Sequence, residues 1–305
     1  MLIIVINILI FLLIPFIFVG VINKTKAFWG GRKGASVLQP FYDFIKLLKK
    51  DFLINKYSSS IFKIAPVITF VSIFMAGLFV PIIKGISIIS FEGSFILFCY
   101  ILGFGKFFSL IGAMDTGSSF EGMGASREAG FSVFVESAFF VIMASIMALS
   151  HNYTFKSLSL LLANGTGLDV LILVLAFLSL GIMLLVEGCR VPVDDPNTHL
   201  ELTMIHEVMV LDNSGFDLAL ISYGSALKMI IFASLMANLI LPLNLGLVSF
   251  VLLYLVVILG LAMIIGTVES SFARLRMTHV YEFIFVMSSF SLIIVALAVM
   301  KIYGG

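Results

Sequence analysis

The stretch LDVLILVLAFLSLGIMLLVE (168–187) runs directly into EGCRVPVDDPNTHLELTMIHEVMVLDNSG (187–215), so a long apolar run ends in the most polar segment of the chain. The first part has the length of a helix that crosses a bilayer, about 20 residues. The second part holds six of the 17 acidic residues and two of the four histidines. Polar groups beside a membrane need water or a partner, so we expect this segment to be central to function.

Composition indicates a membrane protein over the whole chain. Of its 305 residues, 61% are hydrophobic and 11% are charged, whereas soluble domains are about half apolar and about a quarter charged. The formal net charge of +1 gives no sign of a nucleic-acid partner. The two cysteines form no CxxC pair, so neither a disulfide framework nor an iron–sulfur cluster is predicted. The predicted fold class is all-α and polytopic.

Eight apolar runs are long enough to cross a bilayer, and together they make residues 1–305 a single membrane domain. They cover 2–22, 62–83, 92–114, 129–150, 168–187, 217–241, 244–268 and 282–302. The first run has no basic start and no small-residue cleavage site, so a retained helix is expected and not a cleaved signal peptide. A tight turn at 238–244 separates the sixth run from the seventh.

The distribution of lysine and arginine predicts the orientation of the chain. Thirteen of these 18 residues fall in the loops of one side, three fall on the other side, and Lys106 and Lys228 lie inside spans. We therefore expect a multi-pass protein with its long loops in the cytoplasm and both termini outside.

Two cytoplasmic loop segments are predicted to form amphipathic helices of their own. In ASVLQPFYDFIKLLKK (35–50), apolar side chains share one face and charged side chains lie largely on the other, as in an interfacial helix that anchors to the membrane or docks a partner. In the second segment, Asp195 is the expected N-cap, Pro196 the first helical residue and Gly215 the stop. On a helical wheel, its apolar side chains form two separate arcs. We therefore expect this helix to be buried between the bundle and a partner above it.

Ionisable residues inside or at the ends of the spans are the main candidates for function: Glu92, Lys106, Glu136, Glu187, Lys228, Glu269 and Glu282. A charge near the bilayer centre costs at least about 2.5 kcal/mol, so the deepest ones are expected to face the bundle interior. There they either relay protons, since burial brings lysine and glutamate toward neutrality, or form structural pairs such as Lys106 with Glu136. Those near the membrane faces are equally compatible with solvated helix ends.

No catalytic, cofactor or metal site is expected in this chain. The run HLELTMIHE (199–207) is not HExxH, because its two histidines are seven residues apart and would not chelate one metal ion without bending the helix. The GMGAS run at 122–126 lacks the strand and the lysine of a phosphate-binding loop.

Long segments of the chain resemble the complex I subunit 1 family, and within it the membrane-anchor subunits of formate hydrogenlyase and hydrogenase-4 type complexes, which are related to group 4 [NiFe]-hydrogenases. These segments are LGFGKFFSLIGAMDTGSSFEGMGASREAG (102–130), VEGCRVPVDDPNTHLELTMIHEVMVLDNSG (186–215), VESSFARLRM (268–277) and GRKGASVLQPFYDFIKLLKKD (31–51). The resemblance runs over the whole chain, with the eight spans in register.

This resemblance implies a non-catalytic membrane subunit in the cytoplasmic membrane of a prokaryote. Such a subunit docks a cytoplasmic redox arm, contacts antiporter-like membrane subunits, and couples electron transfer to the translocation of protons or sodium ions. The implied partners in the arm are hydrogenase-like large and small subunits and an iron–sulfur protein. They would carry the [NiFe] centre and the iron–sulfur clusters, with no cofactor bound by this chain.

The resemblance also implies roles for particular residues. The implied proton or ion path consists of Glu136, Glu187, Glu201, Glu207 and Glu269, together with Lys106 and Lys228. The residues expected to dock the redox arm are Arg32, Arg127, Arg190, Asp194, Asp195, His199, His206 and Arg274.

The fifth loop departs from the complex I pattern. Thr198 or His199 stands where complex I has the first acidic residue of a glutamate pair, and Asn213 stands where it has a tyrosine. These changes argue against a bound quinone and favour the hydrogenase branch, whose electrons can end on protons. The alternatives are a quinone-chamber subunit of a complex I-like dehydrogenase and a stand-alone ion transporter. The transporter is disfavoured because no inverted repeat or broken span is visible.

Overall fold

The structure, a computed structural model, describes residues 2–51, 53, 57–159, 167–195 and 204–304. Within these residues it is helical, without strands beyond one isolated bridge between Ile83 and Ile86. Its helices are α1 (Leu2–Trp29), α2 (Gln39–Leu48), α3 (Ser60–Gly77), α4 (Ser94–Asp115), α5 (Ser119–Ser150), α7 (Gly167–Glu187), α8 (His206–Met209), α9 (Gly215–Ile240), α10 (Leu247–Ser271) and α11 (Met277–Gly304).

Eight of the helices in the described part of the chain are long and apolar enough to cross a membrane, which confirms the predicted all-α, multi-pass fold. They are all of these helices except α2 and α8. Large apolar side chains remain exposed along their outer faces, as on α10, where Leu252, Val256 and Met263 are each more than half exposed. In a bilayer such side chains face lipid, so their exposure needs no further partner.

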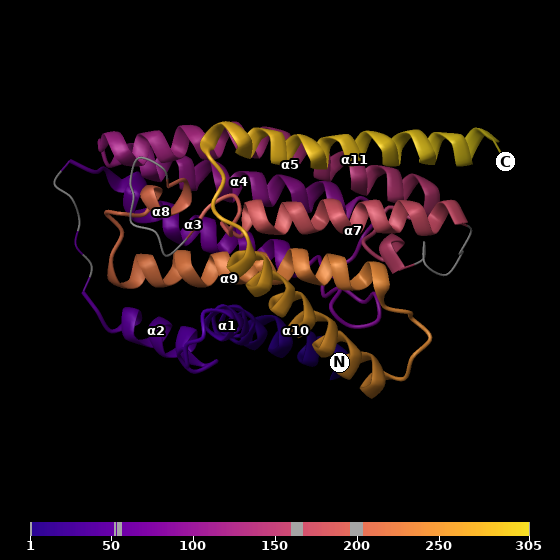
Figure 1. Ribbon diagram of the computed structural model, residues 1–305, viewed down its shortest axis with the longest axis horizontal. Helices are drawn as coiled ribbons and strands as arrows, with labels where there is room; N and C mark the ends of the chain where they lie inside the picture. The colour runs from indigo at the N-terminus through magenta and orange to yellow at the C-terminus, as the bar shows by residue number, and fades with distance from the viewer. Residues whose placement is uncertain (1, 52, 54–56, 160–166, 196–203, 305) are drawn as a thin grey trace.

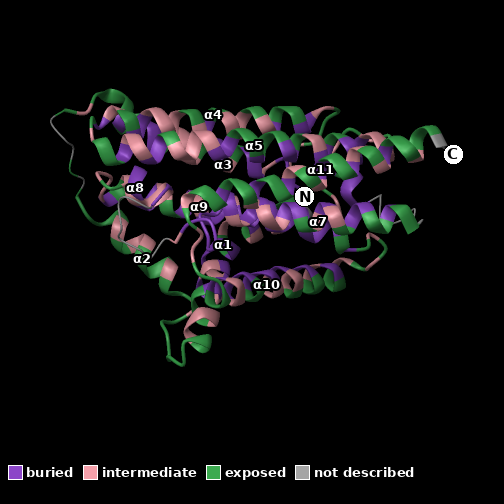
Figure 2. Ribbon diagram, turned by 45° about the horizontal axis from the view of Figure 1, so that its top comes forward, coloured by how far each residue is buried: buried purple, intermediate pink, exposed green. Residues whose placement is uncertain are grey.

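Helix α9 is the centre of the bundle. In its most apolar stretch 67% of the residues are buried, whereas the next highest value among the other spans is 50%. It contacts α1, α2, α3, α7 and α10, while α4, α5 and α11 pack further out (Figure 1). Buried residues accordingly line the inner faces of the helices (Figure 2). The short helices α2 and α8 lie at the end of the bundle opposite the C-terminus (Figure 1).

The second span is shorter than predicted. Helix α3 ends at Gly77, although the apolar run continues to residue 83. Pro81 disfavours helical geometry in the residue before it and has no N–H to donate, so residues 78–93 fold into a turn-rich segment. Two of its carbonyls accept hydrogen bonds from distant asparagines: Asn238 Nδ2 donates to Pro81 O at 2.6 Å, and Asn7 Nδ2 donates to Ile86 O at 3.1 Å. Buried Phe79, Val80, Ile82 and Ile83 still reach the core.

For the other spans, the observed and predicted bounds differ mainly by where the helices begin and end. Helix α5 begins ten residues before the predicted span at 129, so the GMGAS run is part of a helix. Helices α9 and α10 are separated by the turn expected around Pro242. The amphipathic loop helix expected at 35–50 is present as α2, whose Phe44 packs against the core and lies 5.1 Å from the Tyr223 ring.

The prediction of one helix from Asp195 to Gly215 is wrong for the part of this segment that the structure describes. Residues 196–203 lie outside the described residues, and beyond them only the single turn α8 is helical. Gly215, expected as the stop, is instead the first residue of α9. Met204, Ile205, Val208 and Met209 are buried as expected, whereas Leu211 is 48% exposed. They are buried against this chain, since Val208 and Met209 pack over Gly124 of α5. Their burial therefore requires no partner.

Gly124 offers a test of this packing. A Cβ at residue 124 would lie 2.4 Å from Val208 Cγ1 and 2.8 Å from the Ile205 carbonyl oxygen. We expect Gly124→Ala to destabilise the folded protein by about 1–3 kcal/mol, because the backbone of α8 would have to move. Thermal unfolding of the purified protein measures it. The matched control is Gly122→Ala, where a Cβ meets nothing within 4 Å. Equal melting shifts in both variants would show that α8 does not rest on α5.

Candidate functional site

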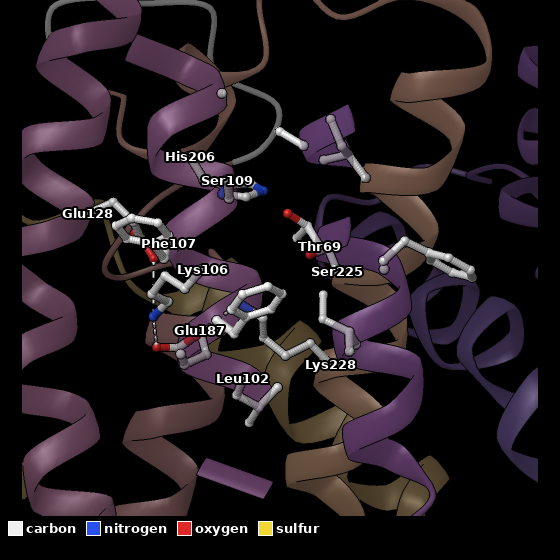
Figure 3. A pocket seen from close by; sticks show the side chains of 18 of the residues that line it. Thr69, Leu102, Lys106, Phe107, Ser109, Glu128, Glu187, His206, Ser225 and Lys228 are labelled. Carbon is white, nitrogen blue, oxygen red and sulfur yellow. Dashed lines mark hydrogen bonds and ion pairs between the residues drawn. The ribbon is translucent and has the colours of Figure 1, made fainter. Parts of the chain in front are cut away.

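A cavity of about 600 Å³ lies between α3, α4, α5, α7 and α9, with residues of α8 at one end. Most of its wall is apolar and aromatic, with Phe70, Phe104 and Phe139 among the lining residues. Its charged residues gather in one part of the wall, where Lys106, Glu128, Glu187 and Lys228 lie near one another (Figure 3). The site thus combines a wide apolar space with a concentrated group of charges.

The charges form one network, here called the cavity cluster: Lys106 (α4), Glu128 and Glu136 (α5), Glu187 (α7) and Lys228 (α9). Lys106 Nζ donates to Glu187 Oε1 at 2.5 Å, and Lys228 Nζ donates to Glu187 Oε2 at 3.0 Å. Lys106 Nζ also lies 3.2 Å from Glu136 Oε1 and 3.5 Å from Glu128 Oε1. Charges taken out of water need such partners, because an unpaired buried charge costs several kcal/mol.

Burial differs sharply within the cavity cluster. The side chain of Glu187 is 5% exposed, whereas that of Glu136 is 45% exposed. Glu187 is therefore enclosed between two ammonium groups, and Glu136 is the carboxylate most open to the surroundings of the cavity. Such a set can bind, pass on or exclude a proton, since each carboxylate lies close to a cation and to a neighbouring carboxylate.

Four of the residues implied for the proton path are brought together in this cluster: Lys106, Glu136, Glu187 and Lys228. Their common location agrees both with a relay and with the structural pairing of Lys106 with Glu136. Glu128 was missed by the sequence analysis. It precedes Glu136 by eight residues, so both side chains fall on nearly the same face of one helix two turns apart, and this spacing is the signal that could have found it.

Glu269 lies in a different ion cluster. Its Oε1 is 3.4 Å from Arg190 Nη1, and its Oε2 is 2.7 Å from Lys26 Nζ as an ion pair without hydrogen-bond geometry. Glu269 is not among the residues that line the cavity. Its two ion pairs instead connect α10 to α1 and to the turn after α7. Glu207 is on α8 and does not line the cavity either, and Glu201 lies outside the described residues.

The residues expected to dock a redox arm have varied environments. Asp194 is 1% exposed, pairs with Arg274 at 2.9 Å, and accepts hydrogen bonds from the backbone N–H groups of Ile205 and His206. Arg190 is also buried, and Arg127 donates to Met204 O at 2.8 Å. Through these contacts Asp194 and Arg127 connect residues 204–206 to the rest of the bundle.

The remaining residues of that set are closer to the surface or the cavity. His206 lines the cavity, Arg32 is exposed, and Asp195 is partly buried. His199 lies outside the described residues. Docking stays a prediction for all of them. Among the residues that the structure describes, no three His, Cys, Asp or Glu side chains are grouped so that they could hold a metal ion.

The chain is similar to known proteins along nearly its full length. Residues 2–300 match the model of the family described as NADH dehydrogenase. The chain is 29% identical to Hydrogenase-4 component C of Escherichia coli (strain K12), covering 76% of this chain and 73% of that protein. It is 24% identical to Formate hydrogenlyase subunit 4 of the same organism, covering 85% of each.

A solved structure shares the fold. A chain in the structure of the membrane-bound sulfane sulfur reductase, an archaeal respiratory membrane complex, superimposes with a TM-score of 0.80 at 18% identity. The match covers 97% of this chain and 98% of that chain. This chain therefore shares its fold with that chain.

Cys189, directly beyond the end of α7, tests the packing around the site. Burial, reinforced by the negative charges of Glu128 and Asp194, raises the pKa of its thiol well above the ordinary value. The thiol is therefore protonated at neutral pH, and only the thiolate reacts quickly. In a Cys99→Ser background, we expect maleimide to label Cys189 only after denaturation, as measured by mass spectrometry. Labelling of Cys189 in the native protein at the rate of a free thiol would show that this thiol is not buried.

Proposed function

Because this multi-pass membrane protein belongs to the NADH dehydrogenase family, as a complex I subunit 1-like chain, we propose that it is the non-catalytic membrane subunit of a hydrogenase-type complex. In this role it docks a cytoplasmic redox arm and couples electron transfer to proton translocation. The observation that carries the proposal is the cavity cluster, five charged side chains from four helices inside an apolar bundle.

The charges favour a role in ion coupling over simple stabilisation. Replacing a buried ion pair by well-packed apolar residues is often neutral or stabilising, so stability alone does not explain five charges at one place. Ionisable residues inside membrane spans are costly, and they typically mark ion pathways and proton relays. The identity of the relatives supports the hydrogenase branch, since both are named as parts of hydrogen-metabolising complexes.

The proposed partners follow from the same relatives. Hydrogenase-like large and small subunits and an iron–sulfur protein would form the redox arm, and would hold the [NiFe] centre and the clusters. Antiporter-like subunits would flank this chain in the cytoplasmic membrane, with the long loops in the cytoplasm and both termini outside. Supporting this orientation, α2 and α8 lie at the end of the bundle opposite the C-terminus.

Glu136→Gln tests the relay. The amide keeps the shape of the side chain and cannot bind or release a proton, so we expect the complex to assemble and its proton translocation to fall about a hundredfold. Acidification measured in proteoliposomes containing the whole complex reports the effect. Glu282→Gln is the matched control, because that carboxylate is 70% exposed and pairs with His279 outside the cavity. Wild-type translocation in the Glu136 variant would rule out a relay through this residue.

A second function, a chamber for a quinone, is favoured by one observation. The cavity of about 600 Å³ has an apolar, aromatic wall with charges at one place, which is the lining that ligand pockets for apolar molecules usually have. A photoreactive quinone analogue would then crosslink to residues of this wall, and excess unmodified quinone would suppress the crosslinks. Crosslinks that are absent, or that excess quinone leaves unchanged, would exclude this function.

A further inference from the structure

The last turns of α1 and the loop that follows fold into one compact unit, here called the α1 tip and defined as residues 24–34. The backbone N–H of Arg32 donates to Ala27 O at 2.8 Å. Lys24 Nζ donates to the backbone carbonyl of Lys33, also at 2.8 Å. These two hydrogen bonds bring the loop back against the helix, so side chains from both lie close together.

This folding gathers positive charge at the α1 tip. Lys24, Arg32 and Lys33 are all exposed, and in the described part of the chain none of them has a carboxylate within ion-pair distance. The Lys24 ammonium instead holds the main chain of a second cationic residue. Because like charges held near one another repel, this arrangement favours the binding of an anion.

Two large aromatic side chains lie exposed within the same unit. Phe28 is 76% exposed and Trp29 is 60% exposed, with their ring centroids 6.0 Å apart. A tryptophan next to lysine and arginine at the end of a membrane helix is typical of the headgroup layer, which accommodates both its apolar ring and its N–H. A soluble acidic ligand would use the cations alone, whereas a phospholipid meets the cations and the aromatic rings together.

The contacts of α1 place its tip at the level where neighbouring spans end. Lys26 pairs with Glu269, and α10 ends two residues later, at Ser271. Glu269 also pairs with Arg190, which lies just beyond the end of α7. Since both spans end at this level, the residues that follow Lys26 leave the hydrocarbon core and enter the headgroup layer.

We propose that the α1 tip binds anionic phospholipid. Lys24, Arg32 and Lys33 face the phosphate of the headgroup, while Phe28 and Trp29 rest in the interface beside it. Attraction between clustered cations and anionic lipid falls off within a Debye length, so the binding is sensitive to salt. The α1 tip does not line the cavity, and this inference is independent of the proposed proton path.

Trp29 gives a direct test, because it is the only tryptophan of the chain. The full chain is placed in phosphatidylcholine nanodiscs in which a fixed fraction of the lipid has brominated acyl chains, which quench tryptophan fluorescence on contact. That fraction is either phosphatidylglycerol or phosphatidylcholine. We expect brominated phosphatidylglycerol to associate with Trp29 about fivefold more strongly than brominated phosphatidylcholine, and high salt to remove the preference.

Paired substitutions test whether the preference belongs to the α1 tip. Arg32→Gln/Lys33→Gln keeps both hydrogen bonds of the tip, since these use main-chain groups of the two residues. We expect the preference to fall below about twofold in this variant. The matched control, Lys49→Gln/Lys50→Gln, removes the same charge from exposed residues at the end of α2, where the carbonyl of Lys50 lies against Gly215 at the start of α9. It should keep the wild-type preference.

Three outcomes would overturn the inference. Equal quenching by the two brominated lipids would show contact with the bilayer without selection of anionic lipid. An equal loss of preference in both paired variants would show a general surface potential and no site at the α1 tip.

The third outcome concerns the whole complex, where the difference in quenching between the wild type and Trp29→Phe isolates the signal of Trp29. Quenching with the same lipid preference is the expected result. Quenching that is present in the separate chain and absent in the complex would show that a partner protein covers the α1 tip.

Discussion

The cost of burying charge in an apolar bundle is the constraint on which the rest of this structure depends. Each of the five charged side chains of the cavity cluster comes from a helix otherwise suited to lipid, and none can remain there without a partner. The Glu187 carboxylate accepts hydrogen bonds from two lysines at once, Lys106 of α4 and Lys228 of α9. That shared carboxylate links α4, α7 and α9 at the cavity.

Away from the cavity, the same rule accounts for the ends of the bundle. Asp194 and Arg274 pair across two loops that are 80 residues apart in the sequence, and Glu269 joins α10 to Lys26 and Arg190. These pairs hold the polar loops close to the bundle on the side of α8. Buried ion pairs at this end of the bundle thus connect the loops to the helices, while the charges of the cavity cluster line an open cavity.

Much of the architecture could be predicted from hydrophobic run lengths. Eight runs became eight long helices, since a span must satisfy its own backbone hydrogen bonds and a helix does so with local contacts. The failures occurred where long-range contacts replaced local ones. Helix α3 ends before Pro81, whose carbonyl accepts a hydrogen bond from Asn238. Residues 204–214 have one helical turn, and the N–H groups of Ile205 and His206 donate to the Asp194 carboxylate.

The sequence by itself determined that the chain spans a membrane, that Lys106, Glu136 and Lys228 had to face inward, and which family the chain resembles. Only the tertiary structure decided which charges meet. Glu128 joined the cavity cluster and Glu269 was placed in another, because pairing depends on how helices distant in the sequence pack together. Run length and helical period describe one helix at a time, whereas an ion pair between helices depends on their relative rotation and depth, which packing sets.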